Sequence, residues 1–180
     1  MGFSIDVRKL YWVMGDADDP QDLCLHGDPI VRIGERTLED DELSVSAAAL
    51  YLLRSLTEDH IAGGEDERMI PCCGHFMMAD DALENVTIVG CPNGIDWSVR
   101  HRDGAVVLSL EDGTEERVSE EGYREEVFRF ADKIEAYYRS CADKVFDGDE
   151  DDFAKNGYTA FWNEWHRRRG AEATIQHQEG

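Results

Sequence analysis

A long run of regularly spaced apolar residues in the last third of the chain places the strongest constraint on its fold. Between residues 120 and 145, large apolar side chains recur every three or four positions, which puts them on one face of an α-helix. The stripe consists of Tyr123, Val127, Phe130, Ala131, Ile134, Tyr138, Cys141 and Val145. Ser119 is a favourable N-cap, and the acidic residues that follow it suit the positive end of the helix dipole. We therefore expect a helix from Glu120 to about Val145 with one face in the core.

Two other segments also have helical patterns. Val45–Leu56 contains three consecutive alanines, which have high helix propensity, and an apolar stripe at helical spacing. Phe153–Arg169 ends in three arginines, whose charge complements the carboxyl end of a helix. The sequence thus predicts three main helices.

Strand patterns occupy much of the remaining chain. Residues 3–7 alternate apolar and polar, and Asp103-Gly104 between two apolar runs is a strong hairpin signal. We expect Leu23–Leu25 to pair with Ile30–Ile33, and a turn at Cys91–Gly94 to join two more strands, Val86–Val89 and Ile95–Arg100. The predicted fold class is α+β: a single domain over residues 1–170, with an antiparallel sheet of about six strands packed by three helices. Residues 171–180 are expected to form a polar tail.

The charge of the chain narrows its possible partners. Forty acidic residues face 18 basic ones, which gives a formal net charge of -22. Such a field repels phosphate backbones, so we expect no nucleic-acid partner, and it favours a basic protein surface. The same composition also arises as a general trait of proteins from salt-loving or GC-rich organisms.

The expected location is the cytoplasm. The first residues lack the apolar segment of a secretory signal, and no apolar run approaches the roughly 20 residues that span a bilayer. Five cysteines is an odd number, which argues against a complete disulfide framework. We therefore expect reduced cysteines and no membrane partner.

Several phrases of the sequence suggest a resemblance to known proteins. They are HGDPIVRIG, SVSAAALYLLRSL, PCCGHFM, VTIVGCPNGIDWSVRH and GYTAFWNEWHRR. In these phrases the chain resembles a group of uncharacterised bacterial proteins of similar length. The resemblance implies a bacterial cytoplasmic protein of one domain, and it assigns no functional residue.

One stretch contains candidate metal ligands. Cys72, Cys73, His75 and Cys91 supply the thiolate and imidazole groups that zinc prefers. Their spacing lacks the two short paired intervals of a typical structural zinc site, which favours buried thiols and no cofactor. A thiolate–imidazolium pair between Cys72 or Cys73 and His75 is a further alternative.

Carboxylates next to this stretch suggest a second kind of chemistry. Asp80, Asp81 and Asp96 flank the predicted strands and have the residue type needed for acid and base catalysis. In a chain with 40 acidic residues such pairs also arise by chance. A small metal-dependent enzyme centred on Cys72–Asp96 is the alternative function.

The last helix is unusually aromatic. Phe161 and Trp165 lie four residues apart and can face the core, whereas Trp162 is rotated by about 100°. A wide core face explains this composition, and so does a partner anchor formed by Trp162 with His166. The preferred function is an acidic, non-enzymatic binding protein of the immunity-like or regulatory kind, which covers a basic partner surface.

Overall fold

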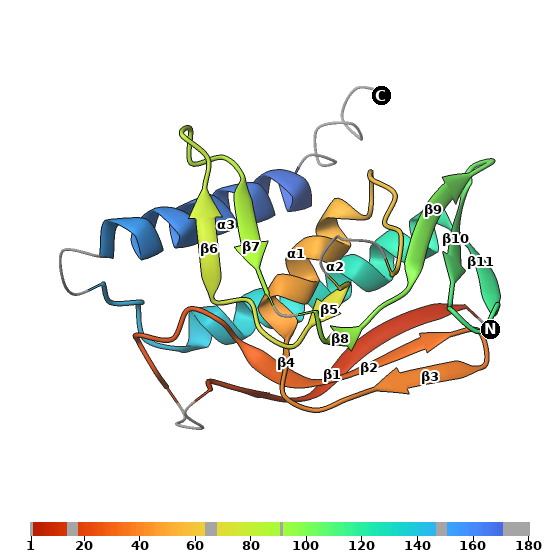
Figure 1. Cartoon of the computed structure of the whole chain (residues 1–180), viewed down its shortest axis with the longest axis horizontal. Helices are drawn as coiled ribbons and strands as arrows, with labels where there is room; N and C mark the ends of the chain where they lie inside the picture. The colour runs from red at the N-terminus through yellow and green to blue at the C-terminus, as the bar shows by residue number, and fades with distance from the viewer. Residues whose placement is uncertain (1, 14–17, 64–67, 91, 147–150, 171–180) are drawn as a thin grey trace.

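The computed structural model describes residues 2–13, 18–63, 68–90, 92–146 and 151–170, so the predicted tail at 171–180 lies outside the described residues. Three helices and several small antiparallel sheets make an α+β structure (Figure 1). In chain order the elements are β1 (Phe3–Tyr11), β2 (His26–Ile33), β3 (Arg36–Glu39), β4 (Leu43–Ser44), α1 (Val45–Arg54), β5 (Ile70–Pro71), β6 (Phe76–Ala79), β7 (Val86–Val89), β8 (Gly94–Ile95), β9 (Ser98–Arg102), β10 (Ala105–Ser109), β11 (Glu115–Ser119), α2 (Glu120–Ser140) and α3 (Asp151–Gly170).

The first sheet has the order β1-β2-β3, with β4 beside the start of β2. The alternation predicted for β1 is confirmed, because Phe3, Ile5 and Val7 are buried. The predicted pairing of residues 23–25 with residues 30–33 is wrong, since the intervening residues 26–29 are part of β2, which pairs with β1. Pro29 is tolerated there because β4 pairs with β2 only up to Gly27 and β3 only from residue 30. No strand on that side needs the N–H group that proline lacks.

The predicted six-stranded sheet is wrong, because the strands form four separate sheets among the described residues. The hairpin at Asp103-Gly104 is confirmed: it joins β9 to β10, and β11 continues the meander. Strand β7, however, pairs with β6, and β8 pairs with β5, so the predicted pairing across residues 91–94 does not form. The β5–β8 pair is only two residues long. Beyond Pro71, the Cys72 N–H donates to the Asn93 carbonyl at 3.0 Å and continues the contact between the two segments.

Helix α1 lies at the centre of the molecule (Figure 1). Residues 45–53 are all buried, and α1 contacts β2, β5 and both other helices. The stripe predicted for α2 is buried from Tyr123 to Tyr138, and Ser119 caps the helix by accepting from Gly122 N at 3.1 Å. Because α2 ends at Ser140, Val145 lies beyond it and is exposed. Within the described residues, no helix is both long enough and apolar enough to cross a membrane.

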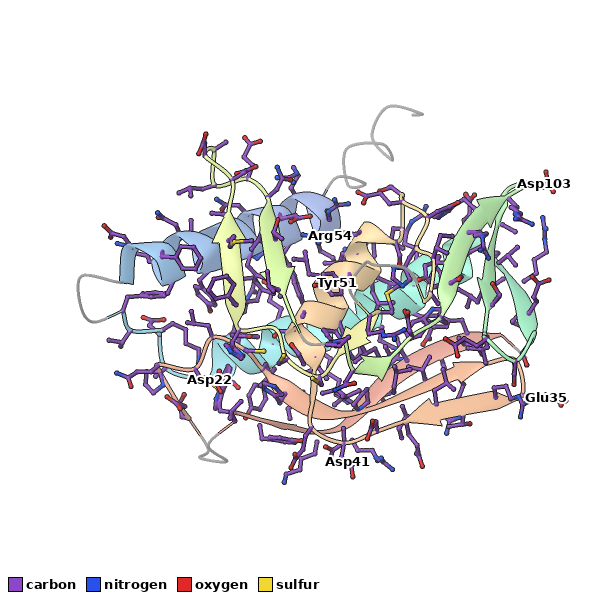
Figure 2. All side chains as sticks on the ribbon, viewed as in Figure 1. Asp22, Glu35, Asp41, Tyr51, Arg54 and Asp103 are labelled. Atoms are coloured by element: carbon purple, nitrogen blue, oxygen red, sulfur yellow. The ribbon has the colours of Figure 1, made fainter. Side chains whose placement is uncertain are left out.

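Helix α3 is held in place by a hairpin and by a buried carboxylate. A Cβ atom at Gly157 would lie 2.2 Å from the Met77 carbonyl oxygen, so glycine lets β6 lie directly on α3. Buried Glu164 accepts from Arg54 Nε and Nη2 at 2.8 and 2.7 Å, and from Val86 N at 3.1 Å. Arg54 lies in the interior in Figure 2, whereas Asp103 lies at the outer margin. These contacts join α3 to α1 and to the β6–β7 hairpin.

Candidate functional site

The cysteines and the histidine of the predicted zinc site have different environments. Cys72 forms a disulfide bond, so its sulfur is not available as a thiolate, and the expectation of fully reduced cysteines is wrong at this position. Cys73 is not disulfide-bonded and is half-buried, and His75 is exposed. In the described part of the chain, no three His, Cys, Asp or Glu side chains are grouped closely enough to hold a metal ion. Cys91 lies outside the described residues, so its part in the predicted site stays a prediction.

Asp96 is the centre of a dense hydrogen-bond network. Its carboxylate is almost fully buried and accepts from His60 Nε2 at 2.7 Å and from Arg68 Nη1 at 3.2 Å. The backbone N–H groups of Met69, Gly63 and Trp97 donate to it at 3.1–3.2 Å. The carboxylate therefore connects residues 60–63 and 68–69, which follow α1 in the chain, to the segment that leads into β9.

This network sets the protonation state of Asp96. Burial alone would raise the pKa of the carboxyl group, but the hydrogen bond from His60 and those from backbone N–H groups outweigh it and lower the pKa. Asp80 is engaged elsewhere, because it accepts from Glu84 N and from Asn85 Nδ2 at the tip of the β6–β7 hairpin. The predicted carboxylate pair thus consists of anchors for two different loops.

The two residues predicted to form a partner anchor do lie together. The Trp162 and His166 rings are stacked with centroids 5.5 Å apart. Trp162 is half-buried and Trp165 is fully buried, so the predicted faces of α3 are confirmed. Trp162 and His166 line an open pocket of about 220 Å³ between α3 and the end of α2, which we call the α2–α3 pocket. Its other lining residues are Glu135, Tyr138, Arg139, Asp143 and Tyr158.

Three aromatic rings form the walls of the α2–α3 pocket. Trp162 meets Tyr138 at 86° and Tyr158 at 84°, with centroids 5.1 and 6.1 Å apart. The Tyr138 hydroxyl donates to the Leu23 carbonyl at 2.8 Å and accepts from Leu25 N at 3.1 Å, which fixes that ring. Burial raises the pKa of both tyrosine hydroxyls, so both rings are neutral at physiological pH.

The charged groups of the pocket are unequally paired. Arg139 and His166 both contact Oε1 of Glu135, the histidine at 3.1 Å, and Trp165 Nε1 donates to Oε2 of the same residue at 3.3 Å. Asp143, in contrast, is exposed and makes no hydrogen bond or ion pair with another described residue. The pocket therefore combines three aromatic walls with one carboxylate that has no partner among these residues.

A second surface feature lies on the outer side of the β6–β7 hairpin. Four large apolar side chains are 36–48% exposed there, and we call them the hairpin patch: Phe76, Met78, Val89 and Phe153. Phe76 is opposite Val89 in the pairing of the two strands, and its ring lies 5.2 Å from that of Phe153 on α3. The exposed acidic residues at the hairpin tip are Asp80, Asp81 and Glu84.

Neither the hairpin patch nor most of the α2–α3 pocket was predicted from the sequence. A signal for the patch was present, because residues 76–78 are apolar at every position, and only one face of a strand can lie on α3. For the pocket the sequence offered only Trp162 and His166. Asp143 and Tyr158 come close to them through the packing of α2 against α3.

Comparison with protein-family models, with curated proteins and with solved structures gave no match.

Proposed function

We propose that the chain is an acidic, non-enzymatic binding protein that covers a basic surface of a protein partner, with the hairpin patch as the centre of its contact face. The exposed apolar patch supports this proposal most directly. Contiguous apolar side chains on a surface mark interaction sites, and aromatic residues and methionine are enriched at the centres of protein interfaces. Phe76, Met78 and Phe153 supply these residue types in one place.

Acidic residues near the patch suit a basic partner. Asp80, Asp81 and Glu84 occupy the loop that connects β6 to β7, and all three are exposed. A polar rim around an apolar centre is the usual arrangement of an interface. With a net charge of -22, long-range attraction would raise the association rate of a basic protein, and salt would reduce that rate.

The test is affinity capture from the source organism followed by measurement on the purified partner. Tagged wild-type protein and a Phe76→Ala variant are compared at low and high KCl, with Ile61→Ala as the matched control. Ile61 is a large apolar residue with similar exposure outside the patch. We expect a basic partner whose affinity falls about tenfold or more with Phe76→Ala, as for an interface hot spot, and is unchanged by Ile61→Ala.

Two results would contradict the proposal. One is a partner that binds wild-type and Phe76→Ala protein equally well. The other is no captured partner together with a large rise in melting temperature in molar KCl, because screening of self-repulsion would then explain the acidity as a halophilic trait.

A further inference from the structure

The α2–α3 pocket has walls of the kind that bind an organic cation. We propose that it is a binding site for an alkylated ammonium group, carried either by a small molecule or by a lysine side chain of a protein. This inference does not depend on the hairpin patch, because none of the patch residues lines the pocket.

The ring geometry provides the first argument. The Trp162 ring is nearly perpendicular to both Tyr138 and Tyr158, so the three rings form a corner instead of a flat stack. The face of an aromatic ring carries partial negative charge, and ammonium groups are recognised by several such faces at once. Tryptophan is the most effective of the aromatic side chains in this role.

The electrostatics provide the second argument. Asp143 is unpaired among the described residues, and its charge contributes, after burial, to the raised pKa of the Tyr158 hydroxyl. Tyr138 and Arg139 belong to the last turn of α2, where the carbonyl groups give the helix end a partial negative charge. A cation in the pocket is therefore attracted by a carboxylate, a helix terminus and the ring faces.

The pocket also contains two basic side chains, Arg139 and His166, but they do not make it a site for an anion. Arg139 and His166 both contact Glu135 Oε1, so each already has a carboxylate partner within the chain. The Arg139 side chain is 74% exposed, so an entering cation can take its place beside Glu135.

The size of the pocket limits the ligand. Its volume of about 220 Å³ is below the range of roughly 300–1,000 Å³ that is usual for drug-sized ligands. A trimethylammonium group or one lysine head group suits this space.

The experiment is a titration of the full chain with choline, followed by calorimetry and by tryptophan fluorescence. The neutral probe 3,3-dimethylbutan-1-ol has the same shape as choline and lacks its charge. We expect saturable binding of choline and at least about tenfold weaker binding of the alcohol, because cation–π attraction requires the charge. Equal binding of both probes, or no binding of choline, would overturn the proposal. Binding of inorganic phosphate in place of choline would also overturn it.

Variants of the pocket test the assignment of residues. Trp162→Ala should weaken choline binding by about 5- to 30-fold, whereas Trp162→Phe, which keeps a ring, should weaken it less. Asp143→Asn should weaken it by a smaller factor without changing the fold. Phe76→Ala is the control outside the pocket and should have no effect. Choline affinity that is unchanged in Trp162→Ala would place the cation elsewhere and refute the site.

Peptides distinguish the two sources of the ammonium group. A short peptide with trimethyllysine is compared with the same peptide containing norleucine, and each is competed against choline. Tighter binding of the trimethyllysine peptide than of free choline assigns the pocket to a protein side chain, and the reverse order assigns it to a small molecule. Failure of the partner capture with Phe76→Ala would leave these titrations unaffected, so the two proposals fail separately.

Discussion

The Asp96 network and the α2–α3 pocket use similar residue types in opposite ways. Both combine a carboxylate, a histidine, an arginine and tryptophan. Around Asp96 the carboxylate is buried, and donors from side chains and backbone N–H groups meet both of its oxygens. In the pocket, Asp143 is exposed and has no such donor among the described residues.

The difference shows which polar clusters are available to a ligand. A buried carboxylate that already accepts several hydrogen bonds stabilises the chain around it, and a ligand would have to displace those donors. An unpaired carboxylate beside aromatic rings has no hydrogen-bond donor among the described residues that a cation would have to displace. Residue composition does not distinguish a closed polar cluster from one that is open to a ligand. The number of hydrogen-bond donors to each carboxylate does.

The largest expected effect concerns Trp165, whose buried ring packs against the pocket residue Trp162. Trp165→Ala should lower the free energy of unfolding by about 3–5 kcal/mol, because it leaves a cavity where a fully buried ring packs on Phe161. Trp162→Ala should cost about 1–2 kcal/mol, since that ring is only half-buried. Urea denaturation measures both, and a larger loss for Trp162→Ala would mean that the pocket is part of the core.

The second prediction compares the two carboxylates directly. Asp96→Asn should destabilise the fold by about 2 kcal/mol, because it removes the charge that His60 and Arg68 share. Asp143→Asn is the matched control and should leave the free energy of unfolding unchanged within error. If the two variants unfold at the same urea concentration, the distinction between a closed network and an open pocket is lost.

The third prediction is the pH dependence of stability. The pKa of Asp96 is lowered in the folded state, so its contribution is fully present above the ordinary aspartate value of about 4. The contribution is lost as the pH falls through the lowered folded value. Urea midpoints measured from about pH 6 to about pH 3 should therefore fall less in Asp96→Asn than in wild type. Asp143→Asn should retain the wild-type slope, and an unchanged slope in Asp96→Asn would show that another carboxylate dominates.

The Glu164→Gln substitution should change the pH dependence of stability in the same direction as Asp96→Asn. Burial would raise its pKa, but the hydrogen bond and the charge of Arg54 outweigh burial and lower it. Glu164→Gln should therefore also flatten the acid limb between about pH 4.5 and about pH 3. Circular dichroism at each pH is the measurement, and a steeper limb than in wild type would contradict the assignment.

Sequence reasoning succeeded where the determining interactions are local. The α2 stripe and the Asp103-Gly104 hairpin depend on residues a few positions apart, and so does the rotation between Phe161 and Trp162. Strand partners were predicted incorrectly because β5 pairs with β8, and β6 with β7, through contacts that the pattern of a single strand does not specify. Asp143 and Tyr158 join Trp162 only after α3 packs on α2.

The most direct test of the central claim is a titration of ¹⁵N-tryptophan-labelled protein with choline, followed by the indole N–H signals. The four indole signals are assigned by substituting the tryptophans one at a time. The Trp162 signal then reports on the pocket, and the Trp97 signal reports on the Asp96 network. If the α2–α3 pocket is the ligand site, the Trp162 signal shifts in a saturable way, and the signal of Trp97, next to Asp96, stays in place. A shift of the Trp97 signal with an unmoved Trp162 signal would contradict the account.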